Sequence, residues 1–297
     1  MRNLDVKNNS NFVPIWAQSE NEEILRAHLG TNIRRKIVMG VFAIINQKGG
    51  VGKTTTAFNM ATELANQGKK VLCMDMDPQG NLTTAMGFKS SEIENNIGKI
   101  FQILIRREPM PDLDDYILSR GKVHLIGSNL TLSVADISIV TATAREYILK
   151  KIIAQVKQQY DYIIIDCPPT LGMLVVNILT AADSIIIPIG ASEMDAQGLE
   201  PLLDTIEMIR LETNPNLTIK GVLVTMYRAR FVECREALDS LYEICPQYGV
   251  KIFETKIGDS TTVGRAFRKR KTLAEYDDNS SLALEYKDFV QEVLKFE

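Results

Sequence analysis

The chain has 297 residues, of which 45% are hydrophobic and 24% are charged, and its formal net charge is −3 at pH 7. This composition allows one large or two small domains with a sizeable core, and it excludes a protein that binds nucleic acid through a uniformly basic surface, so any DNA-binding surface must be a local patch. No stretch approaches about 18 consecutive apolar residues and the N-terminal residues lack the apolar run of a signal peptide, so the sequence predicts a cytoplasmic protein without a membrane span.

Residues 1–37 differ in character from the rest of the chain. They are polar and rich in asparagine, and Ser19 and Glu22 fit a capping box that predicts a short helix ending at Gly30. This segment is too short for an independent helix-turn-helix domain. We therefore predict an N-terminal arm over residues 1–37 and one larger domain over residues 38–297.

Beyond the arm, short apolar runs alternate with amphipathic stretches, which is typical of a parallel sheet covered by helices. Most of the runs are continuous in Val, Ile and Leu, as expected for strands that are buried on both faces. The sequence therefore predicts an α/β fold with three layers, in which a mostly parallel twisted sheet is flanked by helices. The predicted strands are Val41–Asn46, Val71–Asp75, Val123–Ile126, Tyr162–Asp166, Ser184–Ile189, Gly221–Thr225 and Lys251–Phe253.

A helix is predicted between the first two strands. Ala57, Met60, Ala61 and Leu64 repeat at helical spacing, and Gly68 stands where a C-cap glycine belongs. The order of strand, helix and strand makes this segment a βαβ unit.

The loop between the first strand and this helix is rich in glycine and carries two lysines. Its glycines allow several backbone N–H groups to point at phosphate oxygens, and the helix N-terminus adds a favourable dipole. Lys53 would reach the β- and γ-phosphates, and the Thr54 hydroxyl would hold Mg²⁺. A glycine-rich turn without a ligand is the alternative, which the flanking strand and helix and the two lysines disfavour. The predicted nucleotide contacts are Lys48, Gly49, Gly50, Val51, Gly52, Lys53, Thr54 and Thr55.

The sequence KGGVGKTT resembles the deviant Walker A motif of the ParA/MinD family of ATPases, although Gln47 stands where the strict GxxxxGK[ST] pattern has its first glycine. The resemblance runs from about Val41 to the C-terminus, and it implies the P-loop fold of this family with ATP and Mg²⁺ as ligands. It also implies a homodimer formed on ATP binding. Lys48 would reach across this dimer to the partner's phosphates, where it would act in catalysis like an arginine finger supplied in trans.

Two carboxylates follow the second strand. The sequence DMDPQGN, which begins at Asp75, resembles the second signature of ParA proteins. By this resemblance Asp77 would orient or deprotonate the attacking water, which makes it the second predicted catalytic residue. Asp75 points to the other side of the strand, and we expect it to be structural.

The apolar run that ends at Asp166 fits a Walker B strand, and Asp166 would hold Mg²⁺ together with Thr54. Pro168 and Pro169 follow and would stiffen a loop that senses the γ-phosphate. Cys167 is expected to be a small buried neighbour. Four separated cysteines without a CxxC pair and only two histidines give no basis for a disulfide, zinc or catalytic triad site.

The adenine pocket is expected at two further segments. Residues 223–227 resemble the strand and turn that border the adenine in the family, which makes Met226 a predicted contact. Gly258 and Ser260 lie in the second segment and are predicted contacts as well. The chain reads Gly258-Asp259-Ser260 where family members usually show Pro-Arg-Asn.

One local basic patch stands out on this acidic chain, with five cations in the seven residues from Arg265. We predict that it binds the phosphate backbone of duplex DNA without sequence preference, because no interleaved aromatic residues indicate base stacking. A solvated helix face is the alternative interpretation. The predicted DNA contacts are Arg230, Arg265, Arg268, Lys269, Arg270 and Lys271.

The resemblance as a whole implies a partition ATPase of plasmid or chromosome segregation, located on the nucleoid. ATP binding would create a DNA-binding dimer, and hydrolysis stimulated by a ParB-like centromere-binding protein would release the DNA. A MinD-like membrane regulator is one alternative, which the acidic tail Leu282–Glu297 disfavours because anionic lipid repels it. A metabolic P-loop enzyme of the dethiobiotin-synthetase type is the other, and it lacks an accompanying substrate-pocket motif.

Overall fold

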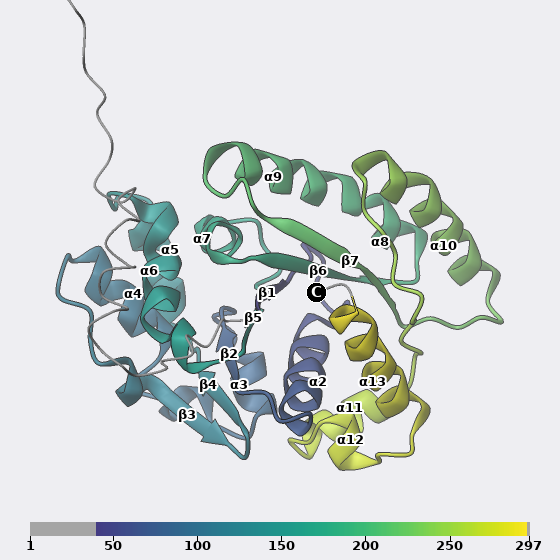
Figure 1. Cartoon of the computed structure of the whole chain (residues 1–297), viewed down its shortest axis with the longest axis horizontal. Helices are drawn as coiled ribbons and strands as arrows, with labels where there is room; N and C mark the ends of the chain where they lie inside the picture. The colour runs from purple at the N-terminus through teal and green to yellow at the C-terminus, as the bar shows by residue number, and fades with distance from the viewer. Residues whose placement is uncertain (1–39, 296–297) are drawn as a thin grey trace, which may run out of the picture. The chain divides into compact units, whose positions relative to one another are not determined.

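The computed structural model describes residues 40–295, which belong to one compact unit. The predicted arm over residues 1–37 lies outside the described residues. Within them the chain forms a sheet in the order β3-β4-β2-β5-β1-β6-β7 (Figure 1). Its strands are β1 Gly40–Ile44, β2 Val71–Asp75, β3 Ile117–Arg120, β4 Val123–Ile126, β5 Tyr162–Asp166, β6 Ser184–Gly190 and β7 Thr218–Thr225.

The sheet is mostly parallel, as the sequence predicts. Only the β3–β4 pair is antiparallel among the pairings of the described strands. Strand β3 was not predicted from the sequence, because this short edge strand has partly exposed residues and lacks the continuous apolar run of a buried strand.

The predicted strand Lys251–Phe253 is wrong in its extent. Only Ile252 pairs with the sheet, through an isolated parallel bridge to Val222 of β7. Pairing is interrupted here because the backbone N–H groups of Glu254 and Thr255 donate to the Glu292 carboxylate, at 2.8 and 3.1 Å, instead of to a strand. The Ile257 N–H then donates to the Val224 carbonyl of β7 at 2.9 Å.

Helices cover both faces of the sheet and complete three layers (Figure 1). One apolar cluster packs α4 to α10 against one face, and a second packs α2, α3 and α11 to α13 against the other. The helices are α2 Lys53–Asn66, α3 Asn81–Ala85, α4 Ile97–Ile105, α5 Thr131–Ile139, α6 Ile148–Val156, α7 Met173–Ala181, α8 Glu193–Gln197, α9 Leu199–Glu212, α10 Val232–Ile244, α11 Thr262–Arg268, α12 Leu273–Tyr276 and α13 Ser281–Leu294.

Alternating side chains of β5 show why its sequence is apolar throughout. Ile163 and Ile165 join the first cluster, whereas Tyr162 and Ile164 join the second. Successive side chains of a strand point to opposite faces, so a strand between two helical layers needs an apolar residue at every position.

Helix α2 ends as predicted. Gly68 has a φ of +82°, and the N–H groups of Gly68 and Lys69 donate to the carbonyls of Ala65 and Leu64, both at 3.1 Å. Glycine adopts this left-handed conformation without steric cost, which explains its place after the last turn.

The C-terminal helix α13 docks on the protein. Its apolar side chains, among them Tyr286 and Phe289, are buried in the cluster that also contains α2. None of the helices in residues 40–295 is long and apolar enough to span a membrane. The four cysteines are free and buried, as predicted.

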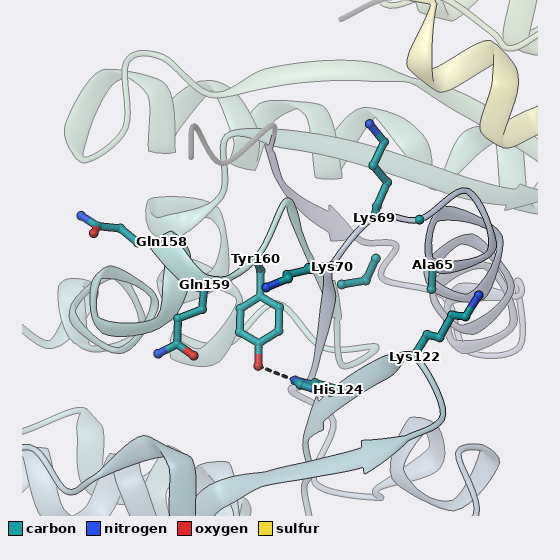
Figure 2. A pocket seen from close by; sticks show the side chains of 10 residues that line it. Ala65, Lys69, Lys70, Lys122, His124, Gln158, Gln159 and Tyr160 are labelled. Atoms are coloured by element: carbon teal, nitrogen blue, oxygen red, sulfur yellow. Dashed lines mark hydrogen bonds between the residues drawn. The ribbon is translucent and has the colours of Figure 1, made fainter. Parts of the chain in front are cut away.

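Figure 2 shows a cavity of about 660 Å³ next to the amino ends of β2 and β4. His124 lies in it, and its Nδ1 atom is 2.7 Å from the Tyr160 hydroxyl. The Lys69 and Lys122 side chains point away from each other, so they do not converge on a common ligand position (Figure 2). The predicted nucleotide residues lie at the opposite edge of the sheet.

Helices α4 and α5 approach closely at Gly98. A Cβ at this position would lie 2.5 Å from the Leu132 nitrogen and 2.7 Å from the Thr131 carbonyl carbon. We expect Gly98→Ala to lower the free energy of unfolding by about 1–3 kcal/mol, because backbone atoms cannot yield easily. Urea denaturation followed by circular dichroism measures this change.

Gly264 in α11 provides the matched control, because the nearest atom to a Cβ there is the end of the Arg268 side chain at 3.8 Å. Gly264→Ala should raise the free energy of unfolding by about 0.5–1 kcal/mol through helix propensity alone. Equal stability of Gly98→Ala and the wild type would show that the two helices are not tightly packed.

Candidate active site

The predicted phosphate loop and acidic residues meet at one edge of the sheet. The loop follows β1, and Asp75 and Asp166 end the neighbouring strands β2 and β5, where they stand in register. Ligands of open α/β sheets bind at the carboxyl ends of the strands. The fold thus brings the separate motifs together.

The loop has the backbone conformation of a phosphate cradle. Gly50 and Gly52 have φ values of +80° and +89°, and a Cβ at Gly49 or Gly50 would meet no atom of the described chain within 4 Å. Gly52 occupies the N-cap of α2, and no side chain in the described structure caps this helix. Backbone N–H groups at the start of α2 therefore remain available to an anion.

The two loop lysines have different environments. The Lys53 side chain is buried, and its ammonium group donates to the Lys48 carbonyl oxygen at 2.8 Å. Burial lowers the pKa of Lys53, and the nearby Asp166 carboxylate opposes this shift. The Lys48 side chain is 45% exposed and forms an ion pair with Asp195. One lysine is thus held inside the site, and the other lies at its surface.

Thr54 and Asp166 form a suitable magnesium site. The Thr54 hydroxyl donates to Asp166 Oδ2 at 2.7 Å, while Oδ1 is buried without a hydrogen-bond partner among the described residues. Burial and the neighbouring Asp75 raise the pKa of Asp166 well above its usual range. A bound cation would stabilise the carboxylate, and oxygen ligands of this kind are those that Mg²⁺ prefers.

The two aspartates after β2 have different surroundings. Asp75 is fully buried and accepts hydrogen bonds from the Thr83 N–H at 2.8 Å, the Thr83 hydroxyl at 2.7 Å and the Asp77 N–H at 3.1 Å. Burial nevertheless raises the pKa of Asp75 to about 6. These bonds fix the turn and agree with the structural role expected for Asp75. Asp77 accepts a hydrogen bond from the Gln79 N–H at 2.9 Å, and its catalytic role stays a prediction.

The expected adenine segments lie side by side beyond β7. Tyr227 forms a parallel bridge with Gly258, and Met226, with a φ of +55°, is 44% exposed. The Gly258 N–H donates to the Glu285 carboxylate of α13 at 2.7 Å. Ser260 is held by its contact with the Thr262 hydroxyl at 3.0 Å. The structure brings these residues together, and their contact with adenine stays a prediction.

Sequence reasoning missed the side chains that fasten the phosphate loop. Asn46 donates to the Pro188 carbonyl at 2.8 Å and accepts from the Lys48 N–H at 2.9 Å. The Thr225 hydroxyl lies 2.9 Å from the Val51 carbonyl oxygen. Pro188 and Thr225 come from distant parts of the chain, so no local pattern indicates their contacts.

The basic patch has an uneven structure. Arg265 and Arg268 are exposed on α11. Arg270 instead donates to the Gly87 carbonyl at 3.0 Å, and Arg120 donates to the Arg270 carbonyl at 2.9 Å. Arg270 thus fastens the loop after α11 as well as adding charge.

Of the remaining predicted cations, Lys269 and Lys271 follow α11 and Arg230 lies after β7. Lys269 stands 5.3 Å from the centre of the Tyr276 ring, and Lys271 and Arg230 are exposed. Arg228 pairs with Asp259, which links the turn after β7 to the segment before α11.

Comparison with known proteins agrees with this geometry. A family model described as an AAA domain matches residues 39–219. The sporulation initiation inhibitor protein Soj of Bacillus subtilis is 37% identical over 253 residues, which cover 85% of this chain and 97% of that protein. The chromosome partitioning protein ParA of Myxococcus xanthus is 33% identical over 255 residues, which cover 86% of this chain and 88% of that protein.

A solved structure has a similar fold. The cobyrinic acid a,c-diamide synthase from Mycobacterium smegmatis, with a bound ATP analogue and magnesium, matches with a TM-score of 0.73 and 29% identity, over 87% of this chain and 95% of that chain. The similarity to Soj and ParA extends over nearly the whole length of those proteins. The chain therefore belongs to the AAA domain family and, within it, to the Soj and ParA ATPases.

Proposed function

We propose that this protein is an ATP-dependent DNA partition ATPase of plasmid or chromosome segregation. Binding of ATP and Mg²⁺ closes a homodimer that binds duplex DNA without sequence preference. Hydrolysis, stimulated by a ParB-like partner, releases the DNA. This cycle would take place on the nucleoid in the cytoplasm.

The observation that carries this proposal is the difference in burial between the two loop lysines. Lys53 is buried within its own phosphate cradle, whereas the Lys48 side chain stands 45% exposed at the surface. An exposed ammonium group beside a phosphate site suits a contact with the nucleotide of a second subunit. Positive charge supplied in trans stabilises the charge that develops on the transferred phosphoryl group.

Residues of this chain would perform the remaining steps. The N–H groups from Gly49 to Thr55 bind phosphate oxygens, and Lys53 neutralises their charge. Thr54 and Asp166 would hold Mg²⁺, which would offset the negative charge of the phosphates. Asp77 orients the attacking water or takes its proton, because its carboxylate follows the strand next to Asp166.

Two other functions remain as alternatives. The structural similarity to a cobyrinic acid a,c-diamide synthase supports a metabolic P-loop enzyme, which a product assay would detect. A MinD-like role at a membrane is disfavoured because α13 buries its apolar face and uses Glu285 and Glu292 to hold the chain beyond β7. Duplex DNA binding measured with ATP, with ADP and without nucleotide separates partition from both, since only a partition ATPase needs ATP for this binding.

The two lysines should respond differently to substitution. Lys53→Ala should abolish nucleotide binding, because it removes the buried charge of the cradle. Lys48→Ala should leave binding largely intact and prevent ATP-dependent dimerisation. Equilibrium nucleotide binding and light scattering with ATP measure the two effects. A Lys48→Ala protein that still dimerises would contradict the assignment of Lys48 to the partner's site.

Asp77→Ala should bind ATP and accumulate as a DNA-bound dimer, because water activation fails while the cradle and the magnesium ligands persist. Loss of one positioned base lowers a rate by about 10²–10⁴-fold. Steady-state hydrolysis in the presence of DNA and the partner protein measures the loss. Turnover within a few-fold of the wild type would move the catalytic role to another residue.

The basic patch should carry DNA binding through phosphates. Charge reversal at Arg265 and Arg268 should weaken binding to all duplex sequences about equally, and it should flatten the slope of log K against log salt by about 0.9 for each lost contact. ATP-dependent dimerisation should persist. These two positions test the patch more cleanly than Arg270, whose side chain also holds Gly87.

The double variant Lys150→Glu, Lys151→Glu serves as the control for this experiment, since both lysines are exposed on α6 at the other face of the sheet. It changes net charge as much as reversal of the two arginines and should affect DNA binding little. Normal DNA affinity of the α11 variant with lost dimerisation would instead identify α11 as part of the dimer interface.

A further inference from the structure

The ion pair of Lys48 lies within a single subunit. Its ammonium nitrogen is 2.5 Å from Asp195 Oδ1, on the short helix α8 that follows β6. The Asp195 side chain is only 10% exposed, and its buried Oδ1 atom has no polar partner other than the Lys48 ammonium group in the described part of the chain. Lys48 thus neutralises a buried carboxylate oxygen.

The surroundings of Asp195 fix its carboxylate in this position. Ser192 caps α8, and its hydroxyl donates to Asp195 Oδ2 at 2.7 Å. Gly190, the last residue of β6, also lies against this carboxylate, and any Cβ at position 190 would collide with it. A glycine at 190, a serine at 192 and an aspartate at 195 therefore form one preorganised acceptor.

This acceptor competes with the role proposed for Lys48. If Lys48 turns from Asp195 of its own subunit to the phosphates of a partner, it gives up this ion pair. When Lys48 leaves, Asp195 Oδ1 becomes a buried charge without its counterion, and a buried charge without a partner is costly. The pair therefore favours the free subunit over the closed dimer.

We propose that Asp195 is a positioning residue that acts as a latch on Lys48. It holds Lys48 in the free subunit, and the nucleotide of the partner must displace it before the dimer closes. The latch thereby sets the ATP concentration and the protein concentration at which dimers form. This inference rests on the proposed function, because it assumes that Lys48 acts in trans.

The test uses Asp195→Asn, which keeps the size of the side chain and an oxygen that accepts from Ser192. Two Lys48–Asp195 ion pairs break when a dimer closes. The dimerisation constant therefore changes by the square of the factor that applies to one subunit. A half-exposed ion pair changes such an equilibrium by a small factor, and a factor of about two to five per latch gives about 4- to 25-fold tighter dimers. Sedimentation or light scattering across a protein dilution series, with Mg²⁺ and a non-hydrolysable ATP analogue, measures this change.

Two controls isolate the latch. Glu193→Gln removes a neighbouring exposed charge of α8 that does not contact Lys48, and it should leave the dimerisation constant unchanged. In a Lys48→Gln background, Asp195→Asn should not restore dimers, because Asp195→Asn acts by releasing Lys48 and not by supplying a contact between the subunits. Thermal melting of each variant verifies that α8 remains folded.

The outcomes separate the two proposals. Tighter dimers of Asp195→Asn, dependent on Lys48, support the latch. Unchanged or weaker dimers, in a wild type that dimerises normally, overturn it, and weaker dimers would show that Asp195 instead directs Lys48 toward the partner. If neither wild type nor any variant dimerises with the analogue, the proposed function fails and the latch fails with it.

Discussion

Buried negative charge at the ends of β2 and β5 is the constraint on which this site depends. Asp75 and Asp166 are fully buried neighbours in register, and two such carboxylates cannot both ionise without compensation. The chain satisfies Asp75 internally, through three hydrogen bonds from the turn that follows it. Asp166 receives one from Thr54 and keeps a second oxygen unsatisfied. Asp166 Oδ1 thus lacks a protein partner among the described residues, which suits the cation predicted there, whereas Asp75 shapes the loop.

The motifs of this site could be predicted because each is contiguous in sequence and stands at the end of an apolar run. The glycines and lysines after β1 and the aspartates after β2 and β5 need only the rule that parallel strands share one carboxyl edge. The fastening contacts could not be predicted in this way. Asn46 meets Pro188 across 142 positions and Thr225 meets Val51 across 174, so only the folded sheet brings them together.

The errors in the predicted sheet have a similar origin. Strand β3 is stabilised by pairing at an edge, so its side chains can remain partly exposed and no apolar pattern identifies it. Residues 251–253 carry the composition of a strand, but Glu292 binds the next two N–H groups and draws the chain toward α13. Local composition indicates which residues tend to adopt an extended conformation. The Glu292 carboxylate, which competes for the backbone N–H groups, decides where strand pairing stops.

Acidic residues of α13 hold the backbone beyond β7 through the same contacts. Glu292 holds the backbone at 254 and 255, and Glu285 holds Gly258 next to the turn after β7. That turn is joined to the phosphate loop, because Thr225 contacts the Val51 carbonyl.

The basic patch is connected to this assembly by a short path. Asp259 follows Gly258 and pairs with Arg228, and α11 with its exposed arginines begins three residues later, at Thr262. Movement of the phosphate loop on nucleotide binding would therefore reach α11 through packed and hydrogen-bonded neighbours. If the protein has the proposed function, these contacts would couple the nucleotide state of the loop to the basic patch.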